Sequence, residues 1–227
     1  MRINKYLALH NYSTRLGGDA LVRNKQVKIN GKLAVLGSKV NKDDVVEVLN
    51  FKNPKTYLYY AYNKPAGIIT HSPQGEGKDI RQSIPLKDVA PIGRLDKNSR
   101  GLIILTNDGR ITNRLLSPEF SHEKEYIVNT LEKIRPSFKQ HMEAGIDIGG
   151  YITKKCKVAL LGDFKFKIIL TEGKKHQIRR MCDALHNGVK SLERIRIMNI
   201  KLGTLASGKY RQIEGEELKT FLKSLGF

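Results

Sequence analysis

Residues 91–109 of this 227-residue chain read PIGRLDKNSRGLIILTNDG, a charged loop followed by an apolar run. The run at 102–105 predicts a buried strand, and the loop before it holds one acid, Asp96. Basic neighbours at 94, 97 and 100 favour the ionised carboxylate, which then accepts hydrogen bonds or acts as a nucleophile. On charge alone, the commoner role of such an aspartate is to cap a turn and pair with nearby arginines. The stretch marks Asp96 as a candidate for chemistry and leaves both roles open.

The surrounding chain predicts strands at 57–62, 101–105, 124–130 and 164–170, with helical patterns between them. Runs of strands without strict strand-helix alternation favour an α+β fold over a doubly wound parallel sheet. We therefore expect a mixed, largely antiparallel sheet with flanking helices. The last strand should have one apolar face, formed by Phe164, Phe166, Ile168 and Leu170. The helix after it should have a buried stripe, formed by Ile178, Met181, Cys182 and Leu185.

The first 50 residues have a pattern of their own and predict a separate small domain. A short helix comes first, and Ser13 or Thr14 then caps a second helix that ends near Asn24. Alternation at 27–29 predicts a strand, Asn30-Gly31 is a hairpin signal, and 45–48 predicts another strand. The polar, proline-containing segment 51–56 suits a linker, which leaves 57–227 as the second domain.

The charge of the chain points to a polyanionic partner. Forty-one Lys and Arg against 22 Asp and Glu leave a formal net charge of +19, which favours nucleic acid. A solvated basic surface or an anionic membrane is the alternative, and the lack of a basic amphipathic helix disfavours the membrane. The apolar runs are too short to cross a bilayer, and the start lacks the apolar core of a signal peptide, so we expect a cytoplasmic protein.

The two cysteines, Cys156 and Cys182, predict neither a disulfide framework nor a thiolate metal cage. The six histidines show no spacing typical of metal ligands, so no metal is expected. No phosphate-binding glycine motif is present either.

The order Gly-Arg-Leu-Asp, Ser-x-Gly-Leu, Leu-Thr-Asn-Asp-Gly within 91–109 is similar to the signature loop of the RsuA-type pseudouridine synthases. Matches to this family run from residue 2 to about residue 212. The resemblance implies that Asp96 is essential for breaking the uridine C1′–N1 bond before the base is reattached through C5. Such an isomerisation has no redox change and no group donor, so it implies no cofactor.

Three further motifs resemble the same family. The Lys-x-Tyr motif at 124–126 implies that Tyr126 packs against the target base and assists proton removal from C5. The Gln-Ile-Arg-Arg-Met run implies that Arg179 pairs with Asp96 and keeps it charged, and Leu192 is expected to pack beneath that aspartate. The Asn-Lys-Pro-x-Gly segment at 63–67 makes Lys64 either RNA-facing or structural.

Other basic residues are candidates for contact with RNA. Arg94 is expected to fill the space of an extracted base or to hold a phosphate. A phosphate-binding surface near a helix start is predicted from Lys174, Lys175, His176 and Arg180, with a solvated basic face as the alternative. Residues 1–50 resemble the S4 RNA-binding domain, which makes Lys5 and Arg15 RNA contacts; Gly17-Gly18 departs from that family's pattern.

The segments 153–158 and 190–199 resemble the branch of the family that modifies large-subunit (23S) rRNA. A 23S stem-loop uridine is therefore the expected substrate, and a monomer the expected state. Two alternatives stay open: the same chemistry on a tRNA anticodon-region or 16S rRNA uridine, or an RNA-binding protein without catalysis.

Overall fold

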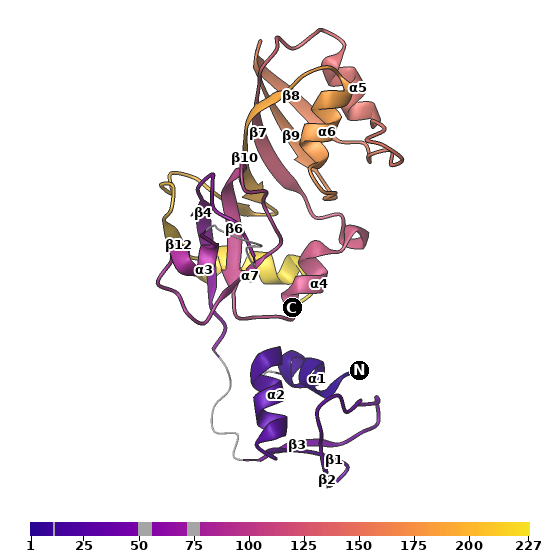
Figure 1. The fold of residues 1–227 in the computed structure, drawn as a ribbon, viewed down its shortest axis with the longest axis vertical. Helices are drawn as coiled ribbons and strands as arrows, with labels where there is room; N and C mark the ends of the chain where they lie inside the picture. The colour runs from indigo at the N-terminus through magenta and orange to yellow at the C-terminus, as the bar shows by residue number, and fades with distance from the viewer. Residues whose placement is uncertain (11, 50–55, 72–77) are drawn as a thin grey trace. The chain divides into compact units, whose positions relative to one another are not determined.

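The computed structural model describes residues 1–10, 12–49, 56–71 and 78–227, so most of the predicted linker at 51–56 lies outside the described residues. The chain forms two compact units, each considered by itself (Figure 1). The first comprises Met1–Leu58 with Asn107–Thr112, and the second comprises Tyr59–Thr106 with Asn113–Phe227.

The first unit has the helices and strands that local sequence signals predict. Helices α1 (Ile3–Leu9) and α2 (Arg15–Arg23) precede strands β1 (Val27–Ile29), β2 (Lys32–Leu33) and β3 (Val46–Val48), which pair in the order β2-β1-β3. Thr14 caps α2, its Oγ1 accepting a hydrogen bond of 3.0 Å from the Gly17 amide. Asn30 and Gly31 both have positive φ, as the tight β1–β2 hairpin requires.

Gly18, one of the two glycines that interrupt the expected α2 pattern, has a packing reason. A Cβ on Gly18 would lie 3.2 Å from the Cα of Asn4 in α1. The missing side chain therefore allows the two helices to approach closely, which offsets the helix propensity that glycine costs, about 1 kcal/mol. The core between helices and sheet consists of Ile3, Leu7, Val22, Val27, Ala34 and Val40.

The second unit is built on one mixed sheet. Among the described residues its strands pair in the order β12-β4-β6-β10-β7-β9-β8, with β5 on β6 and β11 on β10. The strands are β4 (Tyr59–Lys64), β5 (Ala90–Ile92), β6 (Arg100–Thr106), β7 (Lys124–Thr130), β8 (Lys157–Gly162), β9 (Lys165–Leu170), β10 (Val189–Ile197), β11 (Ile200–Lys201) and β12 (Tyr210–Gln212). β6 and β10 run parallel, whereas the other strand pairs in the described ranges are antiparallel, which confirms the expected α+β class.

Short helices flank this sheet: α3 (Ile80–Ser83), α4 (Ile111–Leu116), α5 (Phe138–Ala144), α6 (Gln177–Ala184) and α7 (Gly215–Ser224). Helix α5 contacts β8 and α6 contacts β10 (Figure 1). The predicted stripe of α6 is buried at Ile178, Met181 and Cys182, whereas Leu185 caps the helix and is half-buried. None of the helices in the described ranges is long and apolar enough to span a membrane.

Three predicted strands begin later than expected: β3 at Val46 instead of 45, β4 at Tyr59 instead of 57, and β9 at Lys165 instead of 164. Phe166, Ile168 and Leu170 are buried as predicted, but β9 starts at Lys165 and the Phe164 side chain before it is 50% exposed. Phe164 follows Asp163 in the turn between β8 and β9, outside the paired part of the strand. The alternation of residue types could not show where that pairing begins.

Candidate active site

Asp96 lies in the loop between β5 and β6, and buried contacts hold this loop from within. The Thr70 Oγ1 donates to the Leu95 carbonyl at 2.8 Å and accepts from the Leu95 amide at 3.1 Å. The Ser99 amide donates to the Asp96 carbonyl at 3.0 Å and closes the turn. The Asp96 side chain itself is 36% exposed. A carboxylate on a well-held loop is thus open to a ligand from outside.

The ion partner of Asp96 is His176. The His176 Nε2 lies 3.4 Å from the Asp96 Oδ1. His176 is the N-cap residue of α6 and has a φ of 54°, a left-handed conformation. Sequence reasoning placed His176 on a phosphate-binding surface, so its contact with Asp96 was not predicted.

The expected Arg179–Asp96 ion pair is not formed among the described residues. Arg179 instead donates from Nη1 to the Val189 carbonyl at the start of β10, at 3.2 Å. Arg179 lies in the first turn of α6, where its guanidinium reaches the neighbouring strand instead of the loop. In this structure an imidazole takes the place predicted for the guanidinium.

Lys64 is structural, which corrects its expected place among the RNA contacts. It is fully buried at the end of β4. Its Nζ donates to three carbonyls, those of Pro65 at 2.9 Å, Ile68 at 2.7 Å and Lys97 at 3.4 Å. The ammonium therefore ties the turn after β4 to the loop of Asp96. Burial lowers the Lys64 pKa to about 8, with Asp96 opposing the shift and Arg194 adding to it.

Tyr126 occupies the middle of the sheet. In β7 it lies opposite Arg194 of β10 and Ile168 of β9, and only 8% of it is exposed. Leu192, which was expected to pack beneath the aspartate, is buried in β10 two residues before Arg194. Tyr126 therefore offers only a small area of contact to a bound base.

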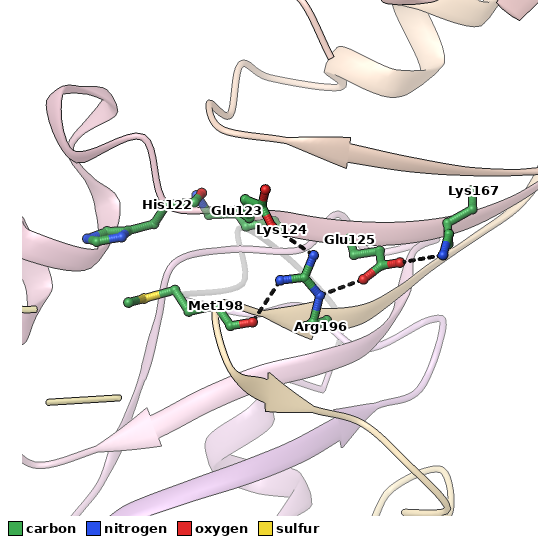
Figure 2. A network of polar contacts seen from close by, with 7 residues as sticks. All are labelled: His122, Glu123, Lys124, Glu125, Lys167, Arg196 and Met198. Carbon is green, nitrogen blue, oxygen red and sulfur yellow. Dashed lines mark hydrogen bonds and ion pairs between the residues drawn. The ribbon is translucent and has the colours of Figure 1, made fainter. Parts of the chain in front are cut away.

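Glu125, the residue before Tyr126, belongs to an ionic network (Figure 2). Arg196 donates from Nε to Glu125 Oε2 at 2.5 Å and from Nη2 to Glu123 Oε2 at 2.9 Å. Lys167 of β9 lies 3.0 Å from the other Glu125 oxygen. Burial opposes ionisation of Glu125, but the bonds from Arg196 and Lys167 outweigh it and lower its pKa. The network joins β7, β9 and β10.

Arg194 is a buried cation that sequence reasoning did not single out. Its Nε donates to the Leu102 carbonyl in β6 at 2.7 Å, and its Nη2 is buried without a hydrogen-bond partner in the described part of the chain. Burial of Lys124 lowers its pKa to about 8, and the nearby charge of Arg194 adds to this shift. Alternation along β10 places Arg194 on the same face as Leu192, and this was the signal that could have drawn attention to it.

The loop before α6 presents the predicted basic surface in part. Lys175 and Arg94 are exposed, Arg180 is half-buried, and Lys174 lies over the Tyr151 ring, 4.1 Å from its centroid. Lys5 and Arg15 are exposed on the helices of the first unit. A buried carboxylate shapes this loop.

That carboxylate is Glu172. Its Oε1 accepts from the Lys154 amide at 2.9 Å and from the Gln177 Nε2 at 2.7 Å. The Gln177 Oε1 in turn accepts from the Lys174 amide at 2.9 Å. These contacts hold the turn that leads into His176 and α6.

Across the residues that the structure describes, no group of three or more His, Cys, Asp and Glu side chains is arranged to hold a metal. Burial raises the pKa of Cys156 to about 11 and that of Cys182 to about 12, so neither thiol ionises near neutral pH. The candidate chemistry rests on the carboxylate loop and the sheet behind it.

The profile of the RNA pseudouridylate synthase family matches residues 58–184, which include the Asp96 loop, Tyr126 and the start of α6. The chain belongs to this family. Across 228 aligned residues it is 40% identical to the dual-specificity RNA pseudouridine synthase RluF of Escherichia coli strain K12, covering 98% of this chain and 79% of that protein. This RNA pseudouridine synthase is therefore an isomerase of the RsuA type.

Two other similarities agree with that assignment. The synthase is 31% identical to the ribosomal small subunit pseudouridine synthase A of Haemophilus influenzae, over 98% of this chain and all of that protein. A crystal structure of a pseudouridylate synthase superposes with a TM-score of 0.71 at 26% identity, covering 99% of each chain. The whole of the described fold is thus shared with a solved member of the family.

Proposed function

We propose that this synthase isomerises a uridine in a 23S rRNA stem-loop and that Asp96 is its catalytic carboxylate. The observation that carries the proposal is the setting of Asp96. Its loop is held by Thr70 on one side and by the buried ammonium of Lys64 on the other, while the carboxylate remains 36% exposed. A rigid, accessible carboxylate can meet the ribose of a nucleotide that has left its stack.

The proposed reaction breaks the C1′–N1 bond, rotates the base and forms a C1′–C5 bond. The C5 proton is lost and N1 gains a proton, so atoms and electrons balance without a co-reactant. Asp96 acts at the glycosidic bond, by attack at C1′, by addition at C6 or by promoting elimination to a glycal. Tyr126 lies against the extracted base, Leu192 packs beneath the site, and extraction costs a few kcal/mol of stacking.

RNA reaches the site through basic residues. We propose that the first unit is an S4-like RNA-binding domain that uses Lys5 and Arg15, both exposed. Around the active site, Arg94, Lys174, Lys175 and Arg180 contact phosphates, and Arg179 joins the catalytic group when RNA is bound. The protein acts as a cytoplasmic monomer without a cofactor.

Replacing Asp96 with asparagine tests the catalytic assignment, because the amide keeps the size of the side chain and removes its charge. Asp96→Asn is expected to bind a 23S stem-loop as the wild type does and to form no pseudouridine, scored by carbodiimide treatment and primer-extension stops. Asp183→Asn, an exposed acid on α6, is the matched control and should remain active. Full activity of Asp96→Asn would refute the assignment.

The substrate requires its own experiment. The relative RluF is named a dual-specificity RNA pseudouridine synthase, so a second RNA target is possible, and another relative is named for the ribosomal small subunit. The two alternatives to 23S rRNA are tRNA and 16S rRNA. Pseudouridines should be mapped in all three RNAs from cells with and without the gene. Loss of a 23S site is the expected result, whereas an unchanged 23S map together with the loss of a tRNA or 16S site would reassign the substrate.

A further inference from the structure

A β-bulge lies in β10 directly beside Tyr126. Arg194 pairs with Tyr126 of β7, but the next pair is Arg196 with Glu125, so Ile195 is an extra residue with no partner of its own. Bulges of this kind bend a strand, increase its twist and redirect neighbouring side chains. The bulge therefore sets how β7 and β10 cross at the position of Tyr126.

Charge explains why the bulge occurs here. In an unbroken register Ile195 would lie opposite Glu125, and Arg196 would lie opposite Lys124, which places two cations side by side. The bulge instead brings Arg196 to Glu125, a pair of opposite charge. Glu125 is almost fully buried, so without Arg196 its buried charge would lack this partner, which would destabilise the fold.

Every guanidinium nitrogen of Arg196 is used in this arrangement. Besides Glu125 and Glu123, its Nη1 donates to the Met198 carbonyl at 2.8 Å, just after β10 ends (Figure 2). Lys167 holds the second Glu125 oxygen from β9. The planar guanidinium thus fixes the end of β10 against β7 from three directions, a geometry that lysine cannot reproduce.

We propose that Glu125 and Arg196, supported by Lys167, are positioning residues that maintain the bulge and thereby aim the Tyr126 ring at the target base. This inference rests on the proposed function, because it assigns Tyr126 a place against that base. Consecutive residues of a strand face opposite sides of a sheet, so Glu125 and its partners lie on the face of β7 opposite to Tyr126. Because only 8% of Tyr126 is exposed, a small rotation of the strand decides whether the ring reaches the base.

The first experiment measures kcat, KM and RNA affinity for Glu125→Gln, Arg196→Met and Arg196→Lys. We expect kcat to fall at least about tenfold in Glu125→Gln and Arg196→Met, with RNA affinity within about twofold of the wild type. Arg196→Lys should recover part of the loss because it restores one ion pair. Unchanged kcat in both Glu125→Gln and Arg196→Met would overturn the proposal.

A matched control separates positioning from general loss of stability. Arg211 of β12 forms a bidentate ion pair with Glu217 of α7, in which its Nη1 and Nη2 donate to the two carboxylate oxygens at 2.6 Å and 2.8 Å. Arg211→Met removes an ion pair of the same kind and should destabilise the protein without lowering kcat. An equal fall of kcat in Arg211→Met would attribute the effect to stability and overturn the proposal. Glu125→Gln, which keeps the side-chain shape, serves if Arg196→Met does not fold.

A double-mutant cycle tests whether the network acts through Tyr126. If it does, Arg196→Met should cost at least about tenfold in the wild-type background and less than about threefold in Tyr126→Leu, which removes the ring. Multiplicative losses would overturn the positioning role and leave the proposed function standing. Wild-type activity of Tyr126→Leu would remove the role of Tyr126 and this inference together, while Asp96→Asn still decides the proposed chemistry.

Discussion

The His176 Nε2 lies 3.4 Å from the Asp96 Oδ1, while Arg179, from the first turn of the same helix, donates to the Val189 carbonyl. The carboxylate at the centre of the proposed chemistry therefore pairs with a group that carries charge only when protonated. The His176 side chain is half exposed, so this pair is screened by water and is modest in strength.

Removing the imidazole should weaken catalysis modestly. His176→Ala is expected to lower kcat by about fivefold, the effect of losing a half-exposed pair worth about 1 kcal/mol. His176→Gln can still donate to Asp96 and should keep more activity than His176→Ala. Single-turnover pseudouridine formation on a stem-loop RNA measures both. If Arg179→Met is far more damaging and His176→Ala has no effect, Asp96 changes partner when RNA binds.

Gly101 should not tolerate a side chain. It has a φ of 105°, and a Cβ there would lie 2.3 Å from the Arg194 carbonyl oxygen and 2.7 Å from the Arg194 amide nitrogen in the neighbouring parallel strand. Gly101→Ala is expected to cost at least about 2 kcal/mol of unfolding free energy through strain and overpacking. Urea unfolding measures it, with Gly109→Ala as control because nothing lies within 4 Å there. Equal stability of the two variants would contradict the close approach of the strands.

The buried ammonium of Lys64 should give stability a distinctive pH dependence. Its pKa is about 8 in the folded protein and 10.5 in the unfolded chain, so above pH 8 the unfolded chain binds the extra proton. Stability contributed by this group therefore rises with pH between about 8 and about 10.5. Urea unfolding at about pH 7.5, just below this range, and at about pH 8.5 and 9.5, within it, should show the wild type gaining stability relative to Lys64→Met as the pH rises. A constant difference between the two proteins would show that Lys64 keeps an ordinary pKa.

The first unit should contribute to the salt dependence of RNA binding. Lys5 and Arg15 are exposed on α1 and α2, and removing one phosphate-binding cation reduces the slope of log affinity against log salt by about 1. Lys5→Ala and Arg15→Ala are expected to do so individually, in filter-binding titrations with a 23S stem-loop. Lys223→Ala, in the last turn of α7, is the control. Unchanged slopes in both variants would remove these residues from the RNA interface.

Local elements could be predicted because local chemistry determines them. The Thr14 cap, the Asn30-Gly31 hairpin and the alternation at 124–130 each depend on residues a few positions apart, and the structure has an element at each place. The start of β9 was placed one residue early because the cover over an apolar face is supplied by distant segments. The bulge at Ile195 depends on charges from three strands and left no local signal.

Sequence by itself determined that Asp96 stands in a loop before a buried strand, in a chain of the pseudouridine synthase family. Tertiary structure alone decided what surrounds that carboxylate. Buried Lys64 donates to two carbonyls of the turn after β4 and to one in the Asp96 loop, and His176, the left-handed N-cap residue of α6, lies beside Asp96 where Arg179 was expected. The contacts of Lys64 with Lys97 and of His176 with Asp96 join residues tens of positions apart, and they form only where the backbone brings the partners within bonding distance.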